Sequence, residues 1–221
     1  MRKFQSKGFT IIEVVLVLAI AGLIFLMVFI ALPALQRSQR DTSRRNDMSR
    51  VDTSLVQYQT NNNSKSDNLP QTGSWLAPAD GTYGPEGVCP TTPTIVTACT
   101  FVRDYMNSGA AGDKEYNNFQ DPDGVPYSLV ITGNWALANG TPEFHSLAGQ
   151  QNSQGDTITS NLVFADGNTG LTINTGSFSD HVVYIIPGAK CDGEYARKAE
   201  KRHFAVLYRL EGAGVYCIDD Q

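Results

Sequence analysis

The stretch Lys7-Gly8-Phe9-Thr10-Ile11-Ile12-Glu13, followed at once by the uncharged run from Val14 to Leu35, decides how this chain is built. The run holds 22 residues without a charged side chain. As a helix it would measure about 33 Å, close to the thickness of the hydrocarbon core of a bilayer. The sequence therefore predicts a membrane-spanning helix over residues 9–35.

Three kinds of segment share this pattern: a cleaved secretory signal peptide, a plain signal anchor, and a helix that also packs into a polymer. A signal peptide has a shorter apolar core and a small-residue cleavage site, and Leu32-Pro33-Ala34 is only a fair one. A plain anchor does not explain Glu13, because a charged residue at the centre of a membrane helix costs about 2.5–3.5 kcal/mol, less near an end. Glu13 is therefore a candidate functional residue.

The same residues resemble the leader junction of type IV prepilins. In that family a membrane aspartic peptidase cuts after the glycine and methylates the new N-terminal residue, usually phenylalanine, and a glutamate stands fifth in the processed chain. Gly8, Phe9 and Glu13 fall in this register. The resemblance implies a leader over residues 1–8, cleavage between Gly8 and Phe9, N-methylation of Phe9, and a role for Glu13 in filament assembly.

The resemblance also implies how Glu13 acts. After cleavage Phe9 presents a cationic amine, and in a stacked filament this amine supplies the counter-charge for Glu13 of a neighbouring helix. Because an unpaired buried charge costs several kcal/mol, the pair would select the axial register. The implied partners are sister pilins in a homo-polymer, the prepilin peptidase, the assembly machinery and, before assembly, the membrane. The precursor would lie in the cytoplasmic membrane and the filament at the cell surface.

Two features depart from the family. Members of the family often have a helix-breaking proline deep in the apolar run, whereas the only proline of this run, Pro33, lies near its end. Gly22 is then the residue that would loosen the middle of the helix, because glycine costs ~1 kcal/mol of helix stability there. An arginine cluster follows the run, on the side that the leader motif places outside, whereas basic residues prefer the cytoplasmic side. The leader motif decides the orientation here, because Asp41 and Asp47 offset part of that cluster.

The helix is expected to continue beyond the apolar run, over residues 36–60. Met48, Val51, Leu55 and Tyr58 are spaced three, four and three residues apart, which places them on one helical stripe. We expect this stripe to pack on the protein's own domain and the Arg and Asp residues to occupy the opposite, solvated face.

Residues 61–221 are predicted to form an extracellular, β-rich head. Gly, Asn, Ser, Thr and Asp are frequent, which suits strands joined by turns. The candidate strands cover residues 127–132, 135–138, 161–165, 181–186, 204–210 and 215–218, and residues 211–214 read as the turn of a terminal hairpin. With the long helix packed on an antiparallel sheet, the fold class is α+β, and the resemblance implies the type IV pilin fold.

Charge in this head argues against general nucleic-acid binding. Residues 61–221 hold nine Lys and Arg against 18 Asp and Glu, a net charge of −9. Such a domain repels phosphates. The one basic cluster, Arg197, Lys198, Lys201 and Arg202, is either a solvated turn or a positive patch that touches DNA, an anionic surface polymer or a neighbouring subunit.

Four cysteines, Cys89, Cys99, Cys191 and Cys217, follow the apolar run. Their even number without CxxC spacing favours disulfides in an oxidising compartment over a metal site. Three pairings are possible, and Cys89–Cys99 with Cys191–Cys217 is favoured because each pair closes a local loop. Four free thiols in a cytosolic protein are the alternative.

A second resemblance lies at Asp121-Pro122-Asp123-Gly124-Val125-Pro126-Tyr127. It is similar to the Asp-Pro-x-Gly-x-Pro-Tyr turn that starts a strand in many major pseudopilins and some pilins. Pro126 suggests that this strand lies at a sheet edge. Asp121 and Asp123 together offer fewer ligands than a dedicated calcium site requires.

The sequence predicts neither an active site nor a cofactor or metal site. His145, His181 and His203 stand in no HExxH pattern, and no catalytic motif appears. We therefore expect a structural subunit of a type IV pilus-like filament. The alternatives are a pseudopilin of a type II secretion or competence system and a membrane-anchored extracellular binding domain or enzyme, which would keep Met1 or lose residues to about Ala34.

Overall fold

The computed structural model divides the chain into two compact units, Met1–Gln39 and Arg40–Gln221. It describes residues 8–61, 73–75, 101–106, 119–140, 142, 146–152, 155–165, 169–174, 181–212 and 214–220.

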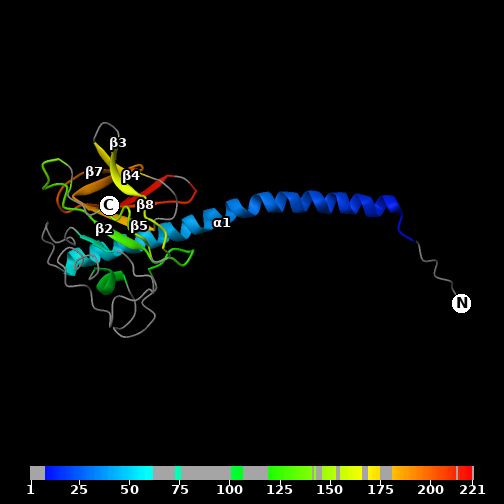
Figure 1. Cartoon of the computed structure of the whole chain (residues 1–221), viewed down its shortest axis with the longest axis horizontal. Coiled ribbons are helices and arrows are strands. Elements are labelled where there is room, and N and C mark those ends of the chain that lie inside the picture. The colour runs from blue at the N-terminus through cyan, green and yellow to red at the C-terminus, as the bar shows by residue number, and fades with distance from the viewer. Residues whose placement is uncertain are drawn as a thin grey trace. The chain divides into compact units, whose positions relative to one another are not determined.

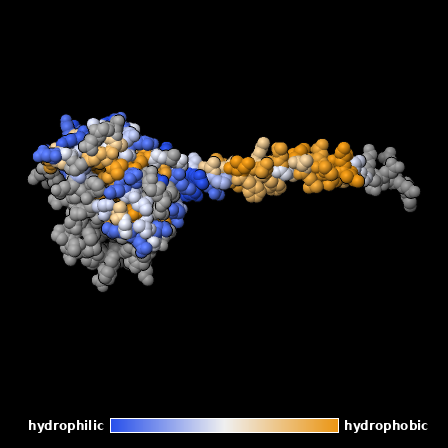
Figure 2. Space-filling view, turned by 45° about the horizontal axis from the view of Figure 1, so that its top comes forward, coloured by the Kyte–Doolittle hydropathy of each residue, from blue (hydrophilic) through white to orange (hydrophobic). Residues whose placement is uncertain are grey.

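The predicted long N-terminal helix is confirmed as α1, which spans Ile11–Asn61 and includes Pro33. Up to Leu35 its large apolar side chains are exposed on every side, and they form the continuous hydrophobic surface that Figure 2 colours orange. By length and composition this part of α1 is able to cross a membrane. A helix that is apolar all round requires lipid or other helices around it.

In the second unit, the later turns of α1 pack on a five-stranded sheet (Figure 1). The strand order is β1 (Gly73–Trp75), β2 (Ser128–Ile131), β5 (Val182–Pro187), β8 (Phe204–Arg209) and β9 (Val215–Asp219). Neighbouring strands are antiparallel except β2 and β5, which pair in parallel from Ser128↔Val182 to Ile131↔Ile185.

A second, fully antiparallel sheet has the order β3 (Asn161–Ala165), β4 (Gly170–Asn174), β7 (Tyr195–Lys198) and β6 (Ala189–Asp192). A long helix followed by these sheets confirms the predicted α+β class. The short helix η2 (Val102–Met106) also contributes to the core beside α1.

The central strands β2, β5 and β8 of this sheet are buried on both faces. Side chains alternate along each strand, so successive residues pack on opposite sides of the sheet. Leu129 and Ile131 of β2 join the cluster around Met48, Val51 and Leu55 of α1. Val130 of β2 points the other way and joins the cluster formed with the second sheet. The predicted apolar stripe on α1 is therefore confirmed, and burial on both faces explains the continuous apolar sequences of β2, β5 and β8.

The two sheets are connected at a sharp corner. Gly188 is the single residue between β5 and β6, and its φ of +74° favours glycine. A Cβ atom at this position would lie 2.5 Å from the backbone nitrogen of Ala136. A disulfide between Cys191 of β6 and Cys217 of β9 links the sheets again, as predicted. Cys89 and Cys99 lie outside the described residues.

Most of the predicted strands are found, and two expectations are wrong. Residues 135–138 form a turn instead of a strand, and the buried Trp135 donates from Nε1 to the carbonyl oxygen of Gly140 at 2.8 Å. The strand that follows Pro126 is not an edge strand, since β2 lies between β1 and β5. Strands β1, β4, β6 and β7 were not predicted.

Candidate functional site

The predicted assembly residue Glu13 lies in the first turn of α1, three residues after Thr10. Its Oε2 accepts hydrogen bonds from the Thr10 backbone nitrogen at 2.9 Å and from Thr10 Oγ1 at 2.8 Å. Thr10 Oγ1 in turn accepts from the Glu13 backbone nitrogen at 3.4 Å. This reciprocal arrangement is a capping box. This box was not predicted, although Thr10-x-x-Glu13 is its usual signature.

The capping box leaves part of the carboxylate available to another chain. Among the described residues, Glu13 Oε1 has no hydrogen-bond partner. Phe9, beside it in sequence, is 88% exposed, and the apolar side chains of the following turns are also exposed. Glu13 is thus a single carboxylate on an apolar surface, with one oxygen able to accept from a cationic donor.

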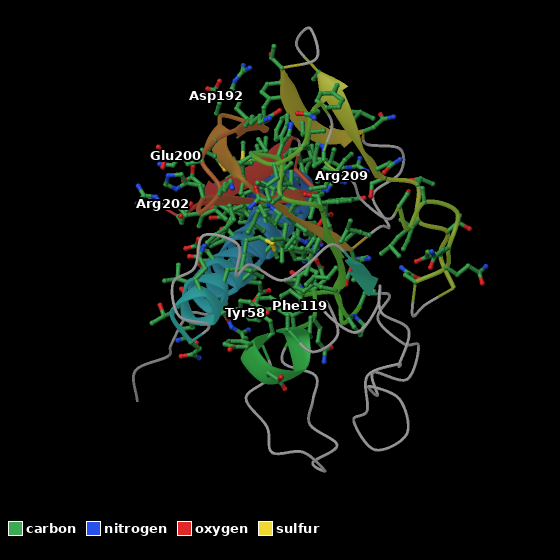
Figure 3. The ribbon with its side chains drawn as sticks, turned by 90° about the vertical axis from the view of Figure 1, so that its left-hand side faces the viewer. Tyr58, Phe119, Asp192, Glu200, Arg202 and Arg209 are labelled. Atoms are coloured by element: carbon green, nitrogen blue, oxygen red, sulfur yellow. A yellow bond between two sulfur atoms is a disulfide. The ribbon has the colours of Figure 1, made fainter. Side chains whose placement is uncertain are left out.

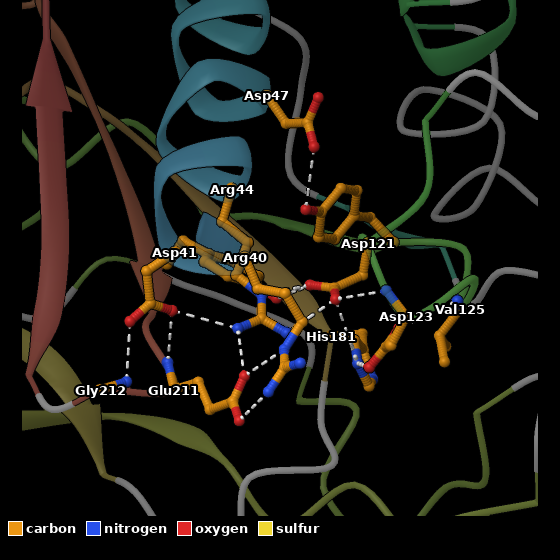
Figure 4. Close-up of polar contacts among 12 residues, drawn as sticks. Arg40, Asp41, Arg44, Asp47, Asp121, Asp123, Val125, His181, Glu211 and Gly212 are labelled. Atoms are coloured by element: carbon orange, nitrogen blue, oxygen red, sulfur yellow. Dashed lines mark hydrogen bonds and ion pairs between the residues drawn. The ribbon is translucent and has the colours of Figure 1, made fainter. Parts of the chain in front are cut away.

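A second group of polar residues lies where α1 meets the turn before β2. Arg44 is fully buried, and its guanidinium forms a forked ion pair with Asp121: Nε to Oδ2 is 2.6 Å and Nη2 to Oδ1 is 2.7 Å (Figure 4). Tyr208 of β8 donates to the same carboxylate at 2.9 Å. The pair therefore joins the helix, the turn and the central sheet.

The expectation that the Arg and Asp residues of α1 occupy the solvated face is wrong for Asp41 and Arg44. Both are buried, because they extend the apolar stripe towards the N-terminus with the same spacing of three and four residues. Asp41 accepts from the backbone nitrogens of Glu211 and Gly212, both at 2.8 Å. Arg40 forms a forked ion pair with Glu211: Nε to Oε2 is 2.7 Å and Nη2 to Oε1 is 2.6 Å. These contacts fix the β8–β9 turn to the helix.

The turn at residues 121–127 presents Asp121 to Arg44. Gly124 has φ of +89°, and its nitrogen donates to the Asp121 carbonyl at 2.8 Å. The Asp123 nitrogen donates to Asp121 Oδ1 at 3.2 Å, so the carboxylate is held from within its own turn. Tyr127, at the end of the turn, donates to Asp47 Oδ2 of α1 at 3.2 Å. The turn that resembles a pseudopilin motif is thus a structural anchor in this chain.

Burial and charge act in opposite directions on this network. Burial would raise the pKa of Asp121, but the hydrogen bonds and charge of Arg44 outweigh it and lower that pKa. Burial likewise opposes the charged form of Arg44, and the contacts with Asp121 still raise its pKa above the ordinary value. The hydrogen bonds from Arg40 lower the pKa of Glu211. The ionised forms are therefore the stable ones near neutral pH.

Asp121, Asp123 and His181 lie close enough to be considered as metal ligands, since their ligand atoms fall within 4.8 Å of one another. They do not fit a metal. Both oxygens of Asp121 already bind the Arg44 guanidinium, which a metal cation would repel. His181 Nε2 contacts Asp123 Oδ2 at 2.8 Å. The group is better described as an extension of the ion-pair network. His145 lies outside the described residues.

The four basic residues predicted as a possible patch do not share one surface. Arg197 and Lys198 are successive residues of β7, so their side chains leave opposite faces. Arg197 pairs with Asp192, and Lys198 Nζ donates to the Ala138 carbonyl at 2.8 Å. Arg202 Nε lies 3.6 Å from Glu200 Oε2. Both residues lie at the outer edge of the view in Figure 3. Lys201 is exposed in the turn that precedes β8. Binding of an anionic partner by these residues stays a prediction.

Comparison with known proteins identifies the first segment of the chain. A family model described as the prokaryotic N-terminal methylation motif matches residues 3–29, which include Gly8, Phe9, Glu13 and the start of the exposed apolar helix. Searches of curated proteins and of solved structures found no match. The motif points to a structural protein processed by prepilin peptidase. The chain carries the N-terminal methylation motif that is typical of type IV pilin and pseudopilin precursors.

Proposed function

We propose that this protein is the precursor of a structural subunit of a type IV pilus-like surface filament. Residues 1–8 form the leader, prepilin peptidase cuts between Gly8 and Phe9, and Phe9 becomes N-methylated. The mature subunit polymerises with other copies through residues 9–35. The observation that carries the proposal is the single carboxylate of Glu13 at the head of an otherwise apolar, exposed helix, in register with the matched motif.

The geometry of Glu13 suggests how one carboxylate serves two stages. In the membrane-inserted precursor the capping box with Thr10 supplies hydrogen bonds to Oε2, which reduces the cost of holding a carboxylate near lipid. Oε1 stays available for the Phe9 ammonium of a neighbouring copy. A cation and an anion that are both removed from water into a helix bundle favour the one axial register that pairs them.

Residues 36–60 carry the second half of the helix, and residues 61–221 form the displayed head. The disulfide between Cys191 and Cys217 supports a location outside the cytoplasm, because such bonds persist in oxidising compartments. The filament surface would then consist of the second compact unit, while the apolar part of α1 is covered by neighbouring copies.

The first experiment determines the N-terminus of the mature protein by intact mass spectrometry. We expect a chain that starts at Phe9 and carries one added methyl group. A start at Met1, or at any residue after 30, contradicts the proposal and favours a membrane-anchored binding domain or enzyme. Gly8→Leu provides the control, since it should leave the leader attached without changing the head.

The second experiment tests Glu13. Glu13→Ala and Glu13→Gln should abolish or greatly reduce filaments in sheared surface fractions, and Glu13→Asp should give an intermediate yield because the charge is kept on a shorter side chain. Processed protein in the membrane should be unchanged. Glu200→Gln, which neutralises an exposed carboxylate of the head, is the matched control. Normal filaments from Glu13→Ala would show that the assigned role is wrong.

A pseudopilin of a type II secretion or competence system is the second candidate. It is supported by the likeness of residues 121–127 to the turn of major pseudopilins. The two candidates differ in the phenotype of a deletion strain: loss of surface filaments in electron micrographs supports the pilus subunit, whereas normal filaments with lost secretion or transformation support the pseudopilin.

A further inference from the structure

Two turns of the second unit each expose a charge that the unit itself does not neutralise. Lys201 is exposed in the turn that precedes β8, and Glu194 is exposed in the turn between β6 and β7. Within the part of the chain that the structure describes, neither side chain forms an ion pair. The proposed assembly through the apolar part of α1 assigns no role to either turn.

The turn that carries Lys201 lies beside the C-terminal end of α1. The carbonyl oxygen of Arg202 accepts from Gln59 Nε2 of the helix at 2.7 Å, and the Lys201 carbonyl accepts from Asn134 Nδ2 at 2.9 Å. These two bonds fix the backbone of the turn while the lysine side chain stays exposed. Because Arg202 pairs with Glu200, Lys201 supplies the net positive charge of this turn.

The turn that carries Glu194 lies at the other end of the helical part of this unit. The Glu194 carboxylate packs on Gly214 of the β8–β9 turn, where a Cβ atom would collide with it. The same β8–β9 turn donates from the Gly212 nitrogen to Asp41 Oδ2 at 2.8 Å (Figure 4). Thr172 Oγ1 donates to the Glu194 carbonyl at 3.0 Å, which fixes the turn to the second sheet.

The two charges are therefore placed at opposite ends of the unit along α1. The helix rises by about 27 Å from Asp41, beside the acidic turn, to Gln59, beside the basic turn. A unit with a cation at one end and an anion at the other is complementary to a second copy placed end to end with it. Such a contact joins different surfaces of two copies, so it does not close on itself and repeats along a filament.

We propose that Lys201 of one copy pairs with Glu194 of the next copy, in a head-to-tail contact between the second units of neighbouring subunits. The proposal rests on the proposed function, because assembly through the apolar helix brings the copies together. An exposed ion pair contributes little energy, so the helices drive polymerisation and the pair selects how neighbouring heads are placed.

Charge favours a second copy over an anionic polymer as the partner of Lys201. Residues 61–221 hold nine Lys and Arg against 18 Asp and Glu, a net charge of −9 that repels a polyanion. The acidic turn around Glu194 is by contrast a single carboxylate on a folded surface, and every copy of the chain supplies it.

The first test reverses each charge separately. Lys201→Glu and Glu194→Lys each place like charges in the contact, and each should reduce sheared filament about fivefold at physiological salt. The deficit should shrink in 1 M NaCl, where salt screens the repulsion. Lys190→Glu makes the same reversal on β6, outside both turns, and is the matched control that should leave the filament yield unchanged.

The second test expresses the two variants in one cell. The Lys201→Glu chain keeps Glu194 and the Glu194→Lys chain keeps Lys201, so alternating copies restore opposite charges at every contact, and filament yield should recover. Zero-length carbodiimide coupling of these filaments should give a peptide in which Lys201 Nζ is bonded to the Glu194 carboxyl carbon. Neither variant alone contains both residues, so this link arises only between two copies.

The outcomes separate this contact from the function on which it rests. Normal filament yield from both single variants, no recovery on co-expression, or absence of the Lys201–Glu194 link from the mixed filaments each overturns the head-to-tail contact and leaves the role of Glu13 intact. A wild-type chain that keeps Met1, or that forms no filament, overturns the proposed function and the contact together.

Discussion

Replacing Arg44 by methionine should destabilise the second unit more than any other change to a charged residue of α1. The side chains of Arg44 and Asp121 are both 0% exposed and share two short hydrogen bonds. Without Arg44, the buried Asp121 carboxylate would keep the Tyr208 hydroxyl and the Asp123 backbone nitrogen as donors, but it would lose its forked cationic partner. His181 Nε2 would remain 4.0 Å from Asp121 Oδ1. Removing one partner of a buried ion pair costs about 3–5 kcal/mol.

The corresponding change in Tm can be estimated from the size of the unit. For a domain of this size, each kcal/mol lowers Tm by about 2–4 °C, so Arg44→Met should lower it by about 6–20 °C. Near-UV circular dichroism of the full chain in detergent follows this transition, because Tyr127 and Tyr208 lie in the same buried region.

Arg45→Met is the matched control. Arg45 is exposed and lies over the Tyr216 ring, so its loss should cost at most about 1 kcal/mol. The double variant Arg44→Met/Asp121→Leu removes both charges and should recover much of the lost stability, since apolar replacement of a whole buried pair is often neutral. The assigned role of the Arg44–Asp121 pair is wrong if Arg44→Met melts within about 2 °C of Arg45→Met, or if the double variant is no more stable than Arg44→Met.

Three further predictions concern the same unit. Gly188→Ala should cost about 2–4 kcal/mol in urea unfolding, from left-handed backbone strain and overpacking at the corner between the sheets; an unchanged midpoint would contradict the corner geometry. Replacing Cys191 and Cys217 together by serine opens a loop with a sequence separation of 26 and should cost about 3–4 kcal/mol, measured as a lower Tm. Acid should destabilise the unit below about pH 4, because Asp121 and Glu211, whose pKa values are lowered in the folded state, must then be protonated; Asp121→Asn should flatten that part of the stability–pH curve.

Local pattern explains what the sequence predicted correctly. The apolar run, the stripe from Met48 to Tyr58 and the alternating or continuous apolar segments of β2, β5 and β8 each depend on residues that are neighbours along the chain. The N-terminal motif is likewise local, so Gly8, Phe9 and Glu13 were recognised without structure. The pairing of Cys191 with Cys217 followed from their proximity in sequence, whereas Cys89 and Cys99 lie outside the described residues.

Contacts between distant residues explain what the sequence did not predict. The partner of Arg44 lies 77 residues away, and nothing in the helix pattern identifies Asp121 as that partner. Strands β6 and β7 are short and partly charged, so they resemble a solvated turn until they pair with each other. The parallel pairing of β2 with β5 depends on the arrangement of the whole sheet.

The order of these contacts along the chain has a consequence for folding. Helix α1 comes first, but Arg40 meets Glu211 171 residues later, and β8 and β9 are the last strands of the chain. Long loops must close before such contacts form, which makes folding slow. In the membrane-inserted precursor proposed above, the head crosses the bilayer from its N-terminal side, so the partners of the helix arrive last. The polypeptide should therefore stay extended enough for translocation until its final hairpin has emerged.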